Sequence, residues 1–471
     1  MIVMKFGGTS VGSAERMQRA MALVAKYRDE QPVVVTSAMT QVTNQLEDLA
    51  QLAARGNRTR LIATKLAALQ AVHNTAVTEL QLDAAAETAL RDVVHAKIAI
   101  LGNILKSVSA LGELTPRGRD LILSFGERLS IHLVVAALNS QGVPAVAVNA
   151  TKFVVTDDTF TDAQPLLSRS KTKAKKLLMP LIKDGVVPVI TGFIGATTEG
   201  VTTTLGRGGS DFSATIVGYC LGADEVWIWT DVDGVMTSDP RIIPEARSIE
   251  HMSYEEAAEL SYFGAKVIHP RTMVPTEELG IPIVIKNTMN PTHVGTRITP
   301  GGDTAARGAK ALTILRDQTM LTIQGKGMRG VYGTAARAFA VLAATKTNIL
   351  FISQASSENN ITLVVEKAAA TRAVRALRQT FAAEVRAKRI DFVQQQSGVS
   401  LIAVVGMGLR QQHGMAGQIF SALGQCGVNI IAIAQGSSEL NITMVVSDQD
   451  GTKALQCIHQ ALYTKSNGGQ P

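Results

Sequence analysis

Short apolar runs punctuate the N-terminal part of the chain and alternate with longer segments whose apolar residues recur at helical spacing. The runs are rich in Val and Ile and apolar at successive positions, which is typical of strands buried on both faces. Six such runs are predicted to be parallel strands: 2–6, 32–36, 145–148, 186–191, 225–229 and 281–285. Strands spaced by helices in this way predict an α/β fold.

Between residues 45 and 112 the pattern changes to Ala, Leu, Gln and Lys at helical spacing, with no Pro. This composition favours helix and predicts two or three helices packed on one side of the sheet. The stretch carries no chemical motif, so its role stays unassigned.

The segment 299–311 is rich in Gly and small residues and follows the last of the predicted strands. We therefore expect a linker there, between a first domain over 1–298 and a second part over 312–471.

An internal repeat occupies the second part. Residues 348–365 align without gaps on 429–446, with 12 of 18 positions identical. The pattern predicts a duplicated α+β module of βαββ type, with units over about 320–395 and 400–465. Each unit alone would leave a sheet edge or face open, so the units are expected to pair with each other or with another subunit.

Composition narrows the function classes. Only 4% of the 471 residues are aromatic, and the net charge of +7 is spread along the chain. Aromatic residues that stack on bases and basic stripes that bind nucleic acid are therefore not expected. The modest positive charge is instead compatible with small anionic substrates.

The cysteines and the N-terminus bear on the compartment. Three cysteines without C-x-x-C spacing support neither a disulfide framework nor a zinc site, so we expect a reducing compartment. The glycine pair follows the N-terminus too closely for a signal peptide, and no membrane span is expected. These features predict a cytoplasmic protein.

Four loops carry candidate chemistry. In the first, Lys5 precedes Gly7 and Gly8, whose backbone amides could approach an anion closely. A plain tight turn explains the same residues equally well. In the second, Arg207 stands among glycines before Ser210 and Asp211, an arrangement suited to gripping a carboxylate. The alternative is a helix cap made by Ser210 or Asp211.

The third loop, Thr230 to Gly234, ends a predicted strand, where open α/β sheets bind ligands, although Asp-Gly is also an ordinary turn. The fourth holds Lys266, a candidate phosphate ligand whose alternative is a solvated surface lysine. His269 is expected to be structural, and no histidines are spaced as a metal site.

Together these loops offer three cations, Lys5, Arg207 and Lys266, beside amide-rich turns. A carboxylate that attacks a γ-phosphate meets like-charge repulsion of about 4 kcal/mol per charge pair at about 4 Å and an effective dielectric of about 20. Cations and Mg²⁺ are therefore required at such a junction.

The motifs KFGGTSVG, VVVTSA, FGERLS, TLGRGGSD, WTDVDGVMTSDPR and ELSYFGAKVIHPRT, taken in order, resemble the aspartate kinases of the amino-acid kinase superfamily. The resemblance implies a three-layer sandwich with a mainly parallel central sheet. It also implies phosphorylation of L-aspartate by ATP and Mg²⁺ to 4-phospho-L-aspartate, the first step towards lysine, threonine, methionine and isoleucine.

The resemblance assigns roles residue by residue. It implies that Lys5 stabilises the transferring phosphoryl group and that Asp211 orients Lys5. Glu127 would accept the α-ammonium of aspartate, and Arg207 its α-carboxylate. The remaining substrate residues would be Ser37, Thr43 and Ser210, and the nucleotide residues Gly7, Gly8, Gly209, Thr230, Asp231, Met236, Arg241 and Lys266. Met236 departs from the tyrosine of many relatives, so an altered nucleotide affinity is expected.

The repeated units resemble the paired ACT modules of this family and look closer to the kinase portion of bifunctional aspartate kinase–homoserine dehydrogenases than to lysine-sensitive enzymes. Threonine is therefore the first choice of effector, with lysine the alternative. The implied effector residues are Asn348, Gln354, Asn429 and Gln435, although either Gln could instead satisfy a hairpin backbone. A homodimer or higher homo-oligomer through these modules is expected.

Two other functions remain open. One is a kinase for another acidic amino acid, since a fold does not fix the chemistry. The other is a non-catalytic amino-acid sensor in which the repeated modules act alone.

Overall fold

The computed structural model describes all residues except 265–267, 304–307, 358, 411 and 465–471. The chain forms two compact units. The first unit comprises Met1–Val235, Ser248–Tyr254 and Val267–Gly302. The second unit comprises Met236–Arg247, Glu255–Lys266 and Asp303–Pro471. Two short stretches of the first 298 residues thus belong to the unit that holds the repeat.

The first unit is built on an eight-stranded sheet in the order β3-β4-β2-β1-β7-β9-β10-β8. All six predicted strands are present and parallel to their neighbours within that set. They are β1 (Ile2–Phe6), β2 (Val33–Thr36), β3 (Ala145–Val148), β4 (Val187–Thr191), β7 (Glu225–Thr230) and β9 (Ile283–Asn287). The edge strands β8 (His251–Ser253) and β10 (Thr296–Thr299) were not predicted, and β10 runs antiparallel to β9.

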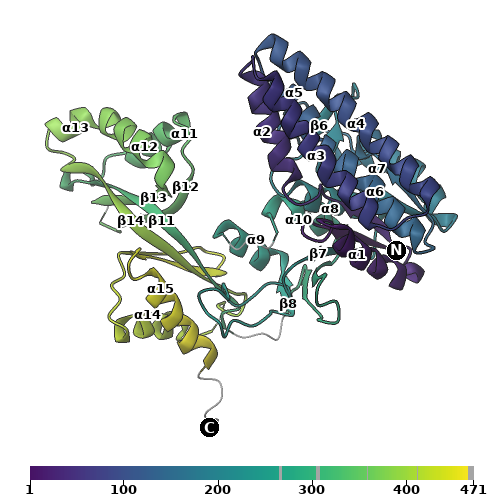
Figure 1. The fold of residues 1–471 in the computed structure, drawn as a ribbon. Coiled ribbons are helices and arrows are strands. Elements are labelled where there is room, and N and C mark those ends of the chain that lie inside the picture. The colour runs from purple at the N-terminus through teal and green to yellow at the C-terminus, as the bar shows by residue number, and fades with distance from the viewer. Residues whose placement is uncertain (265–267, 304–307, 358, 411, 465–471) are drawn as a thin grey trace, which may run out of the picture. The chain divides into compact units, whose positions relative to one another are not determined.

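Helices cover both faces of this sheet, which confirms the predicted three-layer sandwich (Figure 1). Alternate residues of β1 point to opposite faces. Ile2, Met4 and Phe6 join the core formed with α1 (Ala14–Lys26) and α6 (Phe125–Ser140). Lys5 points to the other face, where its partner Asp211 lies on α8. That layer consists of α7 (Leu167–Lys183), α8 (Gly209–Leu221) and α10 (Pro270–Leu279).

The predicted helical stretch forms three helices that pack with α6, in agreement with the sequence pattern (Figure 1). They are α2 (Val42–Ala54), α3 (Thr59–Glu79) and α4 (Ala84–Leu111), followed by α5 (Pro116–Leu123). A short hairpin of β5 (Ile194–Ala196) and β6 (Thr202–Thr204) was not predicted.

Two helical stretches of the described chain, Ala84–Leu111 and Pro116–Ser140, are long and apolar enough to cross a bilayer. The core helix of a soluble protein passes the same test, and 72% of the apolar window in the second stretch is buried inside the protein. These helices are therefore weak evidence for a membrane span.

The second unit holds a six-stranded antiparallel sheet in the order β12-β13-β11-β14-β16-β15. Two long strands, β11 (Ala311–Gln324) and β14 (Phe392–Val405), pair with each other along their length. The half of β11 at 318–324 also pairs with β13, and the half of β14 at 399–405 pairs with β16. Each long strand therefore belongs to the sheet of both repeats. The two repeats are paired within one chain through the β11–β14 ladder.

The helices of the second unit lie in two groups, at opposite ends of the β11–β14 pair (Figure 1). The first repeat supplies α11 (Thr334–Ala344), β12 (Ile349–Gln354), β13 (Asn360–Glu366), α12 (Lys367–Thr380) and α13 (Ala382–Arg386). The second supplies α14 (Met415–Gln425), β15 (Ala432–Gln435), β16 (Asn441–Ser447) and α15 (Gly451–His459). The helix α9 (Tyr254–Tyr262) belongs to this unit from residue 255 onwards.

One expectation from composition is wrong. Cys426 and Cys457 form a disulfide, with their Cα atoms 6.7 Å apart. Cys426 caps the end of α14 and Cys457 lies on α15, and these two helices pack together. The sequence gives no sign of this pairing because the two residues are 31 positions apart and meet only through tertiary packing. Cys220 is buried and free.

Candidate active site

A cavity of about 530 Å³ opens at the carboxyl ends of four parallel strands of the first unit. The strands are β1, β2, β4 and β7, and the loops that follow each of them supply the walls. This edge is where open α/β sheets bind ligands. The predicted site residues that line the cavity are Lys5, Gly8, Ser37, Thr43, Glu127, Gly209, Ser210, Asp211, Thr230 and Asp231.

Lys5 provides a nearly buried cation at the base of the cavity. Its Nζ lies 2.5 Å from Oδ1 of Asp211, which stands in the first turn of α8. The Lys5 side chain is 10% exposed and that of Asp211 is 19% exposed. A carboxylate near a helix N-terminus is also stabilised by the helix dipole. The pair therefore holds the ammonium group of Lys5 in one place beside the cavity.

Glu127, in the first turn of α6, adds a buried carboxyl group to the lining. Its Oε1 accepts a hydrogen bond from the backbone N–H of Ala38 at 3.2 Å, and its Oε2 has no hydrogen-bond partner among the described residues. Burial raises the pKa of Glu127 to about 8, against the lowering effect of the Ala38 hydrogen bond. A buried carboxyl with an oxygen unpaired is suited to receive a cation.

The loop that carries Arg207 turns sharply between β6 and α8. Gly206 and Gly208 have φ values of +73° and +71°, a region that residues with a Cβ adopt reluctantly. Arg207 between them is exposed and has no ion pair or hydrogen bond to any described residue. Its guanidinium is thus free for an anionic ligand, at the rim rather than in the lining of the cavity.

Small groups line the space between these charges. Ser37 follows β2, Ser210 opens α8, and Thr43 lies in the first turn of α2. Gly8 and Gly209 also line the cavity, whereas Gly7 donates its N–H to the carbonyl of Trp229 and is not part of the lining. The Gly209 N–H donates to the carbonyl of Gly206, and the first turn of α8 lines the cavity, so the positive end of this helix favours a bound anion.

The predicted nucleotide residues divide between the two units. Thr230 and Asp231 follow β7 and line the cavity, with the Thr230 hydroxyl donating to the Asp231 carboxylate at 3.2 Å. Met236 and Arg241 belong to the second unit, where Arg241 pairs with Asp239 at 2.7 Å. Lys266 lies outside the described residues. The roles of these last three residues stay predictions.

Several lining residues were not singled out from the sequence, among them Phe193, Thr40 and Gln41. Phe193 follows β4 with a φ of +66°, and Gln41 precedes α2 with a φ of +66°. Thr40 donates to the carbonyl of Gly8 at 2.8 Å and so joins two of the loops. Both stretches follow predicted parallel strands, so the rule that located Thr230 could have located them too.

Two of the predicted effector residues end short strands of the second unit, and Asn348 and Asn429 lie in the loops before those strands. Gln354 ends β12 and lines a cavity of about 230 Å³ together with Met328, Gly330, Val331, Tyr332, Thr334 and Ile361. Gln435 ends the equivalent strand β15 and is exposed. Asn348 and Asn429 are also exposed. Among the described residues lining this cavity, none is acidic.

The sequence of this chain matches known protein families and individual proteins. Residues 1–287 match the amino acid kinase family, and residues 321–381 and 402–462 each match the ACT domain. The chain is 34% identical over 465 residues to aspartokinase 2 of the Arabidopsis thaliana chloroplast, covering 98% of this chain and 84% of that protein. It is 35% identical to the bifunctional aspartokinase/homoserine dehydrogenase of Haemophilus influenzae, of which it spans 56%.

Solved structures agree with the sequence relatives. Aspartokinase III of E. coli, crystallised with aspartate and ADP, superposes with a TM-score of 0.80 at 29% identity and covers 98% of this chain and 100% of that one. The same enzyme with lysine and aspartate gives a TM-score of 0.79 at 30% identity, with 98% and 99% coverage.

Proposed function

This chain belongs to the amino acid kinase family and, within it, to the aspartokinases, and from that premise we propose that it transfers the γ-phosphoryl group of ATP to the side-chain carboxylate of L-aspartate. The observation that carries the proposal is the cavity that holds Lys5, Glu127 and Asp211, beside the guanidinium of Arg207, which pairs with no residue that the structure describes. A buried carboxyl and a free guanidinium are the complements of the two charged groups on an amino acid's α-carbon.

Aspartate binds by its α-carbon groups. The α-ammonium pairs with Glu127, whose unpaired Oε2 accepts from it, and Arg207 grips the α-carboxylate through two parallel N–H bonds. Ser37, Thr43 and Ser210 offer hydroxyls to the remaining polar atoms. With both α-carbon groups held, the side-chain carboxylate is directed towards Lys5, so that binding supplies the orientation that the transfer needs.

The phosphoryl group then meets the carboxylate beside Lys5. Asp211 keeps the Lys5 ammonium aimed at the junction, where it offsets the charge that spreads over the phosphoryl oxygens during in-line transfer. The amide of Gly8 and the N-terminus of α8 hold the phosphates, whereas the predicted amides of Gly7 and Gly209 already donate to the carbonyls of Trp229 and Gly206. Thr230 and Asp231, with Met236, Arg241 and Lys266 from the predicted set, hold the rest of the nucleotide.

Mg²⁺ fits this site. Among the described residues there is no group of three or more His, Cys, Asp or Glu side chains placed to hold a metal. Mg²⁺ bound with a nucleotide needs only one or two carboxylates, because phosphates and water complete its shell. Asp231, exposed at the cavity, is the carboxylate that would hold it. When bound, Mg²⁺ neutralises phosphate charge.

An acceptor panel tests the proposed reaction. ADP release from ATP is measured with aspartate, with glutamate and with no acceptor. The expected result is release that requires aspartate. Release with glutamate alone would favour a kinase for another acidic amino acid, and no release with any acceptor would favour a sensor.

We further propose that threonine binds the second unit and inhibits the reaction. The cavity beside Gln354 offers the amide of Gln354 and the hydroxyl of Thr334 and, among its described lining residues, no carboxylate for a lysine ammonium. Titrating threonine and lysine separately into the kinase assay checks this. Inhibition by threonine at lower concentration than lysine is expected, and the reverse order would make lysine the effector.

The sheet of the second unit ends in the edge strands β12 and β15, which lie beside each other, with the Ser353 hydroxyl donating to the carbonyl of Ile433 at 3.2 Å. In the described chain no ladder of backbone hydrogen bonds pairs either outer edge further, which supports association through the ACT modules in a homodimer or larger homo-oligomer. We propose a cytoplasmic location.

A further inference from the structure

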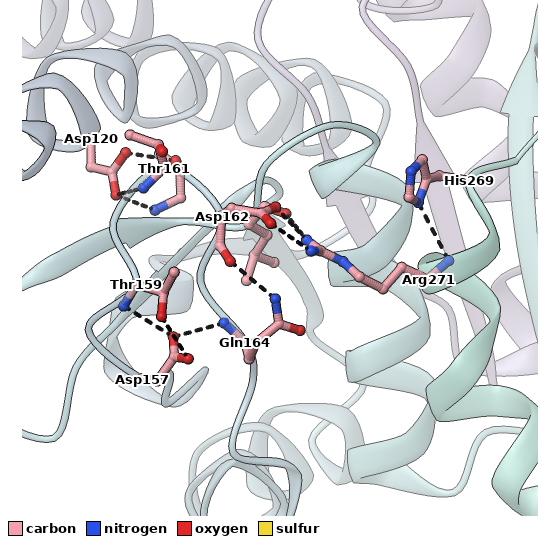
Figure 2. Close-up of polar contacts among 10 residues, drawn as sticks. Asp120, Asp157, Thr159, Thr161, Asp162, Gln164, His269 and Arg271 are labelled. Atoms are coloured by element: carbon pink, nitrogen blue, oxygen red, sulfur yellow. Dashed lines mark hydrogen bonds and ion pairs between the residues drawn. The ribbon is translucent and has the colours of Figure 1, made fainter. Parts of the chain in front are cut away.

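The loop that carries Arg207 is held by two residues that do not line the cavity, Arg271 and Asp162, whose contact is drawn in Figure 2. The fastening side chain is Arg271, in the first turn of α10. Its Nη1 and Nη2 donate to the two carboxylate oxygens of Asp162 at 2.9 and 2.8 Å. Its Nη2 also donates to the carbonyl of Leu205 at 2.8 Å, directly before Gly206. One guanidinium thus joins three segments that are far apart in the sequence.

Asp162 also packs against the turn formed by Gly206, Arg207 and Gly208. A Cβ placed on Gly206 would lie 2.3 Å from Oδ1 of Asp162, so the turn packs directly on this carboxylate. On the other side, a Cβ on Gly208 would lie 3.1 Å from the Cβ of His269. The two glycines flanking Arg207 are therefore held between the Asp162 loop and the start of α10.

The Asp162 loop is itself anchored. Asp120 on α5 is fully buried and accepts from the N–H of Thr161 and the N–H of Thr204, both at 2.9 Å, and from the Thr204 hydroxyl at 2.7 Å. Burial raises the pKa of Asp120, against these hydrogen bonds and nearby Arg119. Asp157 accepts from Gln164 and Thr159 and closes the loop on itself (Figure 2). Thr161 and Thr204 directly precede Asp162 and Leu205, the two partners of Arg271.

We infer that Arg271 and Asp162 are positioning residues for the aspartate α-carboxylate clamp, an inference that rests on the proposed function. The side chains of Arg271 and Asp162 are 28% and 56% exposed. Ion pairs this exposed contribute little to stability, because water screens them. What this pair does fix is the position of the turn that presents Arg207, whose own guanidinium has no described partner to hold it.

Loss of the Arg271–Asp162 contact is expected to affect the two substrates differently. A loosened turn misplaces Arg207 relative to the aspartate carboxylate, while Lys5 and the Asp211 turn of α8 keep their own ion pair. Aspartate binding should therefore suffer more than ATP binding. Misplacement of a binding group by about 1 Å can cost about 100-fold, so a loss of about tenfold or more in aspartate affinity is a reasonable scale.

The test uses the full-length enzyme and steady-state kinetics for both substrates. Asp162→Asn keeps the shape of the side chain but removes its charge, and it lies away from the stretch that holds Lys266. Arg271→Lys keeps the charge but cannot make the bidentate contact. Arg91→Lys is the matched control, because Arg91 also makes a two-contact ion pair, with Glu87, at 31% exposure, on α4 and outside the cavity.

We expect Asp162→Asn and Arg271→Lys each to raise the aspartate KM about tenfold while the ATP KM changes by less than about twofold. Arg91→Lys should leave both constants unchanged. The double variant should be no worse than Arg271→Lys alone, because both substitutions break one contact. Thermal melting of each variant confirms that it is folded.

Equal losses for aspartate and ATP, or an unchanged aspartate KM in folded Asp162→Asn, would overturn the inference. These outcomes are separate from failure of the proposed function, which would appear as absence of aspartate-dependent ADP release in the unmodified enzyme.

Discussion

In the proposed reaction, the protonation state of Glu127 controls how well the cavity binds the α-ammonium group of aspartate. Burial raises the pKa of this carboxyl to about 8, so in the free enzyme it is mostly neutral at pH values below that. A neutral carboxyl forms no ion pair with an ammonium ion, whereas the ionised form does. An arriving α-ammonium therefore lowers the pKa of Glu127 and draws it into the charged state.

This gives a pH dependence. Since the ionised form of Glu127 is the one that binds, kcat/KM for aspartate should rise as the pH increases from mildly acidic values and level off above about 8. The profile of kcat/KM reports the free enzyme. Glu127→Gln should lower kcat/KM by about 100-fold or more and abolish the rise. A wild-type profile that is flat or falls over this range would contradict the role of Glu127.

Single residues differ in how far the sequence predicted them. Lys5, Glu127 and Asp231 could be placed because each sits in a recognisable motif, and the structure gathers them around one cavity. Phe193 was missed although it follows a predicted strand. Asp162 and Arg271 could not be predicted, because they are 109 positions apart and their contact exists only once both loops are folded.

At the scale of elements, the apolar pattern predicted what lies in the core. Six of the eight strands of the sheet were found because their residues are apolar at successive positions. The β5–β6 hairpin has strands of three residues, too short for a periodicity to show. The sharing of β11 and β14 between the repeats depends on strand register, which a repeat in the sequence does not specify.

The disulfide joins α14 to α15, and α15 also braces the segment 236–247. His459 Nε2 lies 3.2 Å from the Thr237 hydroxyl, and Gln456 donates to the carbonyl of Ile242 at 3.4 Å. This segment carries Met236 and Arg241. The cross-link therefore stabilises an element that leads to predicted nucleotide residues.

Reduction of Cys426–Cys457 should destabilise the second unit. Its cysteines are 31 positions apart, and closing a loop of that length lowers the entropy of the unfolded chain by an amount worth about 3 to 4 kcal/mol. Thermal unfolding with and without reductant measures the difference. The Cys426→Ser variant should have the melting temperature of the reduced wild type, both with and without reductant. Equal melting temperatures for the oxidised and reduced wild type would contradict this stabilisation.

At the scale of the whole molecule, the candidate active site and the ACT pair lie in different compact units. The first unit holds the cavity that contains Lys5, Glu127 and Asp211, and the second holds the ACT pair. The second unit also takes in residues 236–247 and 255–266, which the sequence pattern assigned to the first domain. A change in the ACT pair can therefore reach chain segments that carry predicted nucleotide residues.

The central claim is that Lys5 and its neighbours move a phosphoryl group to aspartate. The most direct measurement traps the acyl phosphate product with hydroxylamine and compares the wild type with Lys5→Ala, after both are shown to be folded. The account predicts aspartyl hydroxamate from the wild type and a loss of about 100-fold or more in kcat for Lys5→Ala. Near-normal hydroxamate formation by Lys5→Ala, or none by the wild type with ATP, Mg²⁺ and aspartate, would contradict it.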